Sequence, residues 1–197
     1  MNKRSRLWSR SIAALVTTAA LLLGGCALMV VPQRVPMQKN GAQNSLAAVS
    51  LEVQSGASDG TPYEILNERG AYLGFKANRQ EWSKKLSEAL AQELARRGAM
   101  VRVSAALKLT VAVESITMSQ SDMVTRFNVQ ARAASSGGWS KGYQASSETG
   151  AGAFESADSI AGRLAGQTLA GVIKAILDDP EFLSQINRQA TAAPAKQ

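Results

Sequence analysis

The chain of 197 residues has no histidine and only one cysteine, Cys26. Without histidine it lacks the commonest general base and the most frequent zinc ligand, and without a second cysteine it cannot form an internal disulfide. A domain of this size can fold on apolar burial alone, without such cross-links. The composition therefore argues against zinc chemistry, thiol chemistry and histidine-dependent catalysis.

Two serine–lysine pairs and one acidic segment are the remaining candidates for chemistry. Ser83-Lys84 and Ser140-Lys141 are adjacent in sequence, so their side chains point to opposite faces of a strand or diverge by about 100° on a helix. The acids of Asp178–Glu181 lack the loop of alternating acids around a central glycine that binds calcium. Helix capping explains them instead, and we expect no enzymatic activity, no metal site and no cofactor.

The net charge of +7 depends strongly on the start of the chain. Four basic residues lie within the first ten positions, and their removal leaves 18 Lys and Arg against 15 Asp and Glu. A residual charge of this size gives no basis for nucleic-acid binding. We therefore expect no nucleic-acid partner.

A short apolar run follows these basic residues and leads directly to the cysteine. It extends from Ile12 to Leu23, too short to span a bilayer stably, and ends in Gly24-Gly25. These are the parts of a secretory signal. With leucine three residues before Cys26, the segment resembles a bacterial lipobox, in which the cysteine thiol is diacylated. We predict a lipoprotein signal peptide over residues 1–25 and lipidation of Cys26; the alternative is an ordinary secretory signal with a chance cysteine.

The residues after the cysteine favour a flexible connection. Pro32 and Pro36 interrupt regular structure, and a stretch rich in Gln, Asn and Gly follows. We predict a lipidated tether over residues 26–45, with apolar residues 28–31 exposed against lipid or a neighbouring protein. A periplasmic domain is expected over 46–189 and a disordered tail over 190–197.

Apolar periodicity predicts the elements of this domain. Period-two alternation marks four strands, near residues 47–54, 101–115, 126–133 and 139–145. Four-residue spacing and capping signals mark two long helices and a short third one, over residues 78–97 and 155–177 and from Pro180 onward.

Two local irregularities complete the predicted fold. The alternation over residues 101–115 breaks near Ser104, and Ile116 switches parity, which indicates a β-bulge at the end of that strand. A weaker pattern over residues 63–75 is consistent with a short hairpin or an irregular arm. The predicted fold class is α+β: a single antiparallel sheet with two long helices on one face, in the order β-α-β-β-β-α, and a short C-terminal helix.

Three groups of side chains are candidate contact surfaces. Trp139 and Tyr143 share one strand face, where they are either core residues or, if exposed, an aromatic anchor for a partner. Arg126 and Arg132 belong to a polar row on the opposite sheet face, which is either solvated or binds an acidic partner. The glycines of the second long helix form a smooth stripe that packs on the sheet or on the first helix, or else meets a partner; they are Gly162, Gly166 and Gly171.

Five short segments follow one another in an order typical of a known family: Arg96–Val101, Ser119–Val129, Tyr143–Ser146, Gly152–Ala157 and Phe182–Ile186. In this order and spacing they resemble the YajG family of bacterial lipoproteins. The resemblance implies a periplasm-facing lipoprotein of Gram-negative bacteria, with no established activity and no site residues to carry over. The order of helices and strands also resembles that of envelope transport-accessory lipoproteins. In enteric lipoproteins, an aspartate directly after the acylated cysteine favours retention in the inner membrane. Here that residue is Ala27, which implies a location in the outer membrane.

The resulting hypothesis is a non-enzymatic lipoprotein, anchored in the outer membrane through Cys26 and facing the periplasm. It acts by binding, as an accessory or scaffold in envelope assembly or transport, with an envelope protein as its partner. The alternative is a module that holds peptidoglycan fragments or lipid between the helices and the sheet.

Overall fold

The computed structural model describes residues 26–37, 46, 49–56, 59–67, 73–121, 124–150 and 156–192. The predicted signal peptide, residues 38–45 of the predicted tether and the last five residues of the predicted tail lie outside them. Within these ranges the chain forms α+β structure, with two sheets and three helices.

The larger sheet has five strands in the order β5-β2-β6-β7-β8. Their bounds are Ser50–Ser55 for β2, Met100–Val101 for β5, Leu107–Ser121 for β6, Val124–Ser135 for β7 and Ser140–Gly150 for β8. The β6–β7 and β7–β8 pairs are antiparallel hairpins, as predicted.

The prediction of a purely antiparallel sheet is wrong at β2. This strand runs parallel to both β5 and β6. Helix α2 (Arg79–Arg96) lies in the connection between β2 and these strands. A connection that includes a helix returns the chain to the end of the sheet where it started, so the strands on either side of it are parallel.

A second sheet, absent from the prediction, has the order β1-β4-β3. Strands β3 (Tyr63–Asn67) and β4 (Leu73–Ala77) form an antiparallel hairpin, which confirms the weaker pattern seen in the sequence. Strand β1 (Cys26–Met29) adds to β4 in parallel, with Cys26 opposite Leu73. The predicted tether thus begins with a strand of the folded domain.

Helices α2 and α4 begin where their capping signals lie. The Asn78 Oδ1 accepts a hydrogen bond of 3.2 Å from the Glu81 N–H at the start of α2. Helix α3 (Ala157–Leu177) follows β8, and α4 (Pro180–Ala192) begins after Asp179, whose Oδ1 accepts from the Glu181 N–H at 3.0 Å. Pro180 occupies the first helical position, where its missing N–H costs nothing.

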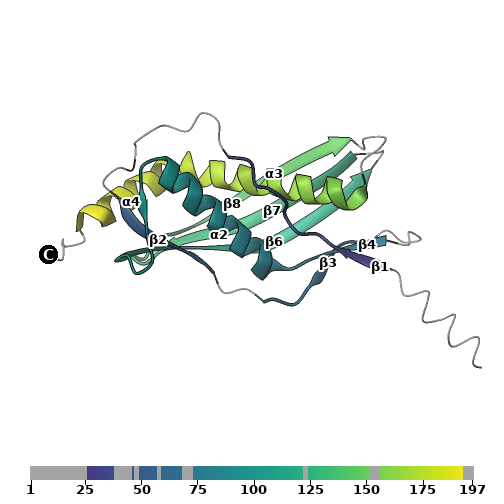
Figure 1. Ribbon diagram of the computed structural model, residues 1–197, viewed down its shortest axis with the longest axis horizontal. Coiled ribbons are helices and arrows are strands. Elements are labelled where there is room, and N and C mark those ends of the chain that lie inside the picture. Colours follow the sequence, from purple (N-terminus) through teal and green to yellow (C-terminus); the bar gives the residue numbers. More distant parts are fainter. Residues whose placement is uncertain are drawn as a thin grey trace, which may run out of the picture.

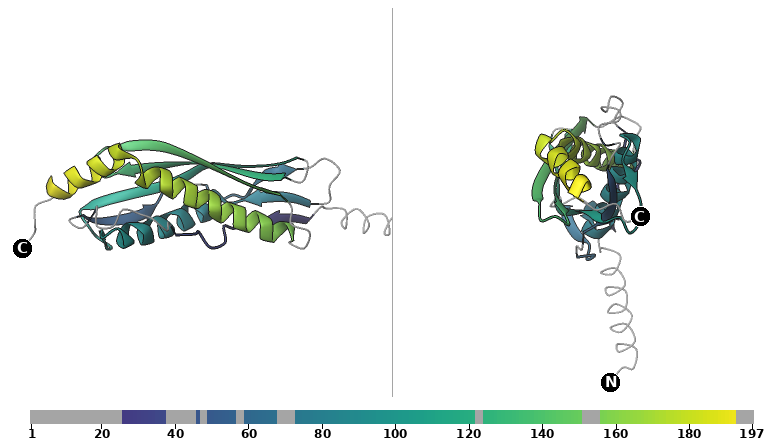
Figure 2. Two further views of the ribbon diagram at one scale, coloured as in Figure 1. Left: turned by 90° about the horizontal axis from the view of Figure 1, so that it is seen from above. Right: turned by 90° about the vertical axis from the view of Figure 1, so that its left-hand side faces the viewer.

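Helices α2 and α3 cover one face of the five-stranded sheet (Figures 1 and 2). Side chains fill the space between these layers. Trp82 of α2 stacks on Phe127 of β7 with ring centroids 6.0 Å apart, and both rings are fully buried. Further fully buried residues of this layer are Leu86, Leu90, Leu94, Leu109, Leu164 and Leu169.

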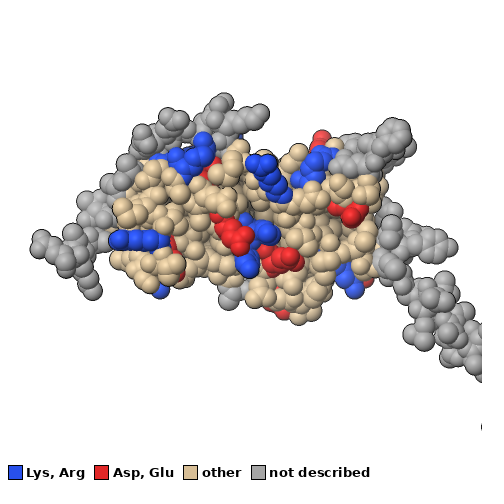
Figure 3. All heavy atoms as spheres, viewed as in Figure 1, with Lys and Arg blue, Asp and Glu red and all other residues tan. Residues whose placement is uncertain are grey.

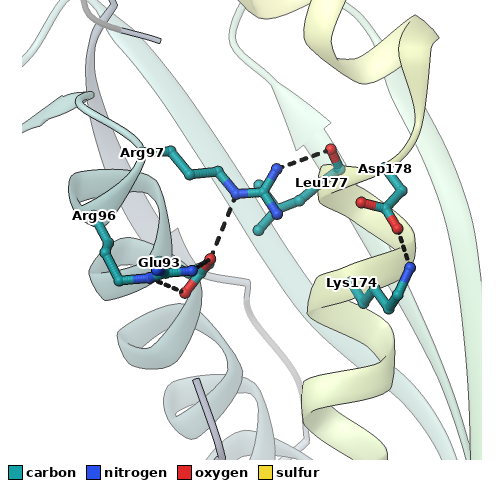
Figure 4. A network of polar contacts seen from close by, with 6 residues as sticks. All are labelled: Glu93, Arg96, Arg97, Lys174, Leu177 and Asp178. Carbon is teal, nitrogen blue, oxygen red and sulfur yellow. Dashed lines mark hydrogen bonds and ion pairs between the residues drawn. The ribbon is translucent and has the colours of Figure 1, made fainter. Parts of the chain in front are cut away.

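An ionic network joins the C-terminal ends of α2 and α3 (Figure 4). Glu93 of α2 is only 1% exposed and accepts from Arg96 at 2.6 Å. Arg97 bonds Glu93 at 3.4 Å and donates to the Leu177 carbonyl at 3.3 Å. Burial alone would raise the pKa of Glu93, but the two guanidinium groups hold that pKa below its usual value.

The predicted bulge lies in β6, between Val113 and Ser115. The strand does not end there but continues to Ser121, paired with β7 throughout. Ser83 Oγ accepts a hydrogen bond of 2.8 Å from the Val113 N–H, so a helix side chain satisfies a β6 backbone group beside the bulge, beyond the end of the β2 pairing.

Candidate functional surface

The segment that follows Cys26 packs on the folded domain. Leu28 is half-buried, and Val30 is 4% exposed. The Val30 N–H donates to the Lys76 carbonyl at 2.8 Å, and the Val30 carbonyl accepts from Trp82 Nε1 at 2.9 Å. The prediction that residues 28–31 lie exposed is therefore wrong for Val30, while Met29 is 44% exposed.

Residues 30–37, which we call the strap, continue across α3. The Gln33 N–H donates to the Gly162 carbonyl at 3.0 Å. A Cβ atom on Gly166 would lie 2.7 Å from the Arg34 carbonyl oxygen, and one on Gly162 would lie 2.8 Å from Gln33 Cγ. The two glycines therefore let the strap approach the helix closely.

The third glycine of the stripe has a different neighbour. A Cβ atom on Gly171 would lie 2.9 Å from the Cβ of Ala145 in β8. The predicted packing on the sheet is thus confirmed for Gly171. Gly162 and Gly166 instead contact the strap, which none of the sequence-based alternatives had included. The signal that could have suggested it is the run of apolar residues 28–31 beside Cys26.

The opposite face of the sheet carries the predicted polar row of β7. Arg126, Asn128, Gln130 and Arg132 alternate with buried residues and are exposed. Arg126 pairs with Glu148 of β8, and Arg132 Nε bonds Glu114 Oε1 of β6 at 2.6 Å. Both arginine side chains remain 54% exposed. Each guanidinium is neutralised by its own carboxylate, so the row offers no excess of positive charge to an acidic partner.

Two shallow hollows lie between these ion pairs on the same face. One is lined by Glu114, Gln130, Ala131, Gly142, Tyr143 and Gln144, and the other by Asn128, Val129, Gln130, Gln144, Ala145 and Ser146. A Cβ atom on Gly142 would meet nothing within 4 Å. We call this exposed side of β6, β7 and β8 the open sheet face. It presents amide and hydroxyl groups between two ion pairs.

The aromatic candidates lie on the other side of the sheet. Trp139 and Tyr143 are 8% and 9% exposed, so they do not form an exposed patch. Trp139 lies 5.6 Å from the Phe182 ring of α4, and its Nε1 donates to Glu181 at 3.3 Å. The Tyr143 hydroxyl donates to Asp179 Oδ2 at 2.6 Å. These residues hold the start of α4 against β8.

Lysine 141 completes this contact between β8 and α4. Its Nζ lies 2.9 Å from carboxylate oxygens of both Asp179 and Glu181. Burial would raise the pKa of Asp179, but the Tyr143 and Lys141 hydrogen bonds lower it. Burial and the Asp179 carboxylate raise the pKa of Tyr143. The acidic segment singled out in the sequence therefore caps and docks α4.

Within the described residues, no group of three or more Cys, Asp and Glu side chains is arranged to hold a metal ion. Helix α3 is long and apolar enough to cross a membrane, but 72% of its most apolar stretch is buried inside the domain. On the helix side of the molecule, basic and acidic side chains are interspersed (Figure 3). In that view, this side therefore has no large patch of one charge sign.

Comparisons with known proteins place these features in a family. The family model Lipoprotein_16, described as uncharacterized lipoprotein, matches residues 76–187. Among solved structures, protein XCC0632 from Xanthomonas campestris, of family DUF330, has 13% sequence identity and a TM-score of 0.52, over 82% of this chain and 99% of that one. This likeness concerns the fold alone.

A second solved structure and a search of curated proteins add little. A minor lipoprotein from Acinetobacter baumannii aligns with 75% of this chain and 93% of its own, at 13% identity and a TM-score of 0.32. That TM-score is too low to support an argument about the fold. The search of curated proteins found no match.

Proposed function

Because the chain belongs to the family of uncharacterized lipoproteins, and is therefore held on a membrane by lipid, we propose that Cys26 carries the lipid after removal of residues 1–25. The protein then faces the periplasm, as the resemblance to the YajG family implies, and lies on the outer membrane, as Ala27 after the cysteine implies. It has no enzymatic activity and acts by binding, as an accessory or scaffold in envelope assembly or transport.

The observation that carries the binding role is the open sheet face. A sheet with helices on one side leaves its other side to solvent or to a partner. That side carries amide and hydroxyl groups between two ion pairs, from Asn128, Gln130, Gln144 and Ser146. Such a surface supports hydrogen-bonded recognition of a polar protein surface.

The alternative, a ligand held between the helices and the sheet, is less well supported. The side chains of that layer are packed on one another, with Trp82 stacked on Phe127 at its centre. A lipid or peptidoglycan fragment would need to displace these fully buried groups. The hollows described above lie on the open sheet face instead.

In-cell photo-crosslinking tests the binding role. A photoreactive amino acid at Asn128 or Gln130 should give one discrete product with a second, different envelope protein. The matched control is the same amino acid at Gln167, which is exposed on α3 and should not give that product. Equal yields from both surfaces, or no product from the open sheet face, would contradict the proposal.

A further inference from the structure

The residue proposed to carry the lipid lies at one end of the domain. Strand β1 pairs with β4 from its first residue, with Cys26 opposite Leu73. At its other end, β4 reaches Ala77, which pairs with Tyr63 of β3. The Tyr63 hydroxyl bonds both the N–H and the carbonyl of Ile116 in β6. Cys26 therefore lies about four strand positions, or about 13 Å, from the level of Ile116.

The β6–β7 hairpin ends at the same end of the molecule as Cys26. From Ile116, β6 continues for about five positions, or about 16 Å, to Ser121. Strand β8 ends and α3 begins at this end too, whereas α4 lies at the opposite one (Figures 1 and 2). We call its described residues the anchor end: Cys26, Ser119–Ser121, Val124, Thr125, Thr149, Gly150 and Ser156.

We infer that the anchor end rests on the lipid headgroups and that the long axis of the domain points away from the membrane. The inference rests on the proposed lipidation of Cys26 and adds the surface that meets the bilayer. Acyl chains on Cys26 lie in the hydrocarbon core, so they hold the backbone of that residue at the level of the headgroups. A flexible tether of about 20 residues would let the domain move about 25 Å away. No residue lies between Cys26 and β1, so the fold begins at the membrane surface.

The chemistry of the anchor end is compatible with this contact. Between the Arg126–Glu148 ion pair and this end, the described residues of β6, β7 and β8 carry no charge. Val124, at the start of β7, is one of the large apolar side chains that remain exposed. Uncharged polar groups and an apolar side chain can enter the headgroup region without the cost of desolvating an unpaired charge.

The long sides of the domain have no comparable basis for membrane binding. On the open sheet face, each arginine is neutralised by its own carboxylate. On the helix side, basic and acidic side chains are interspersed in the view of Figure 3. Neither side therefore shows the surplus of positive charge that attracts proteins to anionic lipid. The position of the lipid at Cys26 then decides which surface meets the bilayer.

Quenching of a fluorescent label by lipid tests the orientation with the full, lipidated chain. When Cys26 carries the lipid, a substitution to cysteine introduces a single free thiol for the label. Ser121→Cys places the label at the anchor end, and Ser140→Cys is the matched control, because this exposed serine lies at the far end of β8. The vesicles contain phosphatidylethanolamine, phosphatidylglycerol and a lipid with a nitroxide quencher on its headgroup.

Two further labels distinguish an upright domain from one that lies on its side. Asn128 is exposed on the open sheet face, and Gln167 is exposed on the helix side. The two positions lie at a similar level along the molecule, because Thr168 bonds Ser147 of β8, which pairs with Phe127. An upright domain holds Asn128→Cys and Gln167→Cys at similar distances from the bilayer, whereas a domain on its side brings only one of them close.

We expect quenching at Ser121→Cys to be several-fold stronger than at Ser140→Cys, with similar, intermediate quenching at the two side positions. Quenching at either side position as strong as at Ser121→Cys, or equally weak quenching at both serine positions, would overturn the inference. A spacer of about ten glycine and serine residues between Cys26 and Ala27 should lower quenching at Ser121→Cys, because it adds about 17 Å of flexible chain. Unchanged quenching would contradict the role of the direct connection to β1.

Flotation of the vesicles separates this test from that of the anchor. A chain that floats with the vesicles and carries labelled fatty acid, but shows another pattern of quenching, contradicts only the orientation. A chain that carries no lipid on Cys26 contradicts the proposed anchor, and the orientation with it.

Discussion

Replacing Gly166 by alanine should destabilise the protein, although the same substitution usually stabilises a helix. In the interior of a helix, replacing glycine by alanine stabilises by roughly 1 kcal/mol. Here the added methyl group would lie 2.7 Å from the Arg34 carbonyl of the strap, and backbone cannot move aside as easily as a flexible side chain. The close approach, rather than helix propensity, therefore decides the outcome.

We predict that Gly166→Ala lowers the free energy of unfolding by about 1–2 kcal/mol, as overpacking does. Urea titration followed by circular dichroism measures it. Gly162→Ala is the matched control, because the nearest neighbour of its added methyl group would be the flexible Gln33 side chain, and its cost should be smaller. A rise in stability for Gly166→Ala would show that the strap does not lie on α3 in solution.

Glu93 should make stability depend on pH. Its pKa is lowered in the folded state by Arg96 and Arg97, against the effect of burial. A lowered folded pKa means that the stabilisation is complete above the unfolded pKa, about 4.3, and is lost as the pH falls through the folded value. The protein should therefore become easier to unfold as the pH falls below about 4.3.

The variant Glu93→Gln separates this contribution from those of other carboxylates such as Asp179. At pH 7 it should be less stable by about 1–3 kcal/mol, since it leaves the buried Arg97 without its counter-charge. Unfolding curves at several pH values should show a smaller loss on acidification for the variant than for the parent chain. Parallel pH profiles for the two proteins would contradict the role assigned to Glu93.

At the scale of elements, Ser83 illustrates how α2 completes β6. Its hydroxyl accepts from the Val113 N–H at 2.8 Å and donates to the Arg79 carbonyl at 2.7 Å. Ser83→Ala would leave the Val113 N–H buried without an acceptor, so we predict a loss of about 1–3 kcal/mol in the free energy of unfolding.

Ser87→Ala is the control for this prediction. Ser87 lies one turn further along α2 and is also buried, but its hydroxyl bonds only the Lys84 carbonyl of its own helix at 2.8 Å. Its removal should cost little, because that carbonyl keeps its place in the helix. Equal losses for the two variants in thermal or urea unfolding would show that the bond to β6 does not stabilise the domain.

The elements that were predictable from sequence have local signals. The start of α2 depends on Asn78 and Glu81, three residues apart, and the hairpins depend on short connections between alternating segments. The parallel pairing of β2 with β6 was also open to inference, because a helix lies between them. Strand β1 was not predictable in this way, since its four residues show no alternation and its partner β4 begins 47 positions later at Leu73.

The surface predictions depended on which face each element buries. Alternation along β7 correctly placed Arg126 and Arg132 on the exposed side. It could not reveal that Glu148 and Glu114 neutralise them, because those acids come from neighbouring strands. Trp139 and Tyr143 had two interpretations in the sequence, and the docking of α4 decides for burial. Glu93 could have been recognised as buried, since it lies four residues after Ala89 on the apolar side of α2.

At the scale of the whole molecule, the proposed lipidation of Cys26 would determine where the domain resides. We predict that Cys26→Ser moves the protein from the membrane fraction to the soluble fraction and abolishes incorporation of labelled fatty acid. Lipid chains contribute about 0.8 kcal/mol per buried methylene, and several chains on one residue hold a protein stably. Cell fractionation followed by immunoblotting measures the change.

The control for this prediction is Ser55→Ala, which changes a hydroxyl elsewhere in the domain and should leave the protein in the membrane fraction. Unchanged fractionation of Cys26→Ser, together with retained lipid label, would show that the anchor lies elsewhere. Retained membrane association without label would instead indicate that the domain itself binds a membrane component. Both outcomes contradict lipid anchoring at Cys26 as the sole attachment.

The strap changes how mechanical load would pass through this protein. With the lipid on Cys26 as proposed, a bound partner and the membrane that move apart would load the chain first at Cys26 and along β1. Because β1 lies beside β4 in register from Cys26 to Met29, a pull along the strand loads those hydrogen bonds together, as shear. Only after they yield would the bonds from Val30 and Gln33 to the domain break and the chain lengthen. The attachment would thus stay stiff up to a rupture force, unlike a flexible linker.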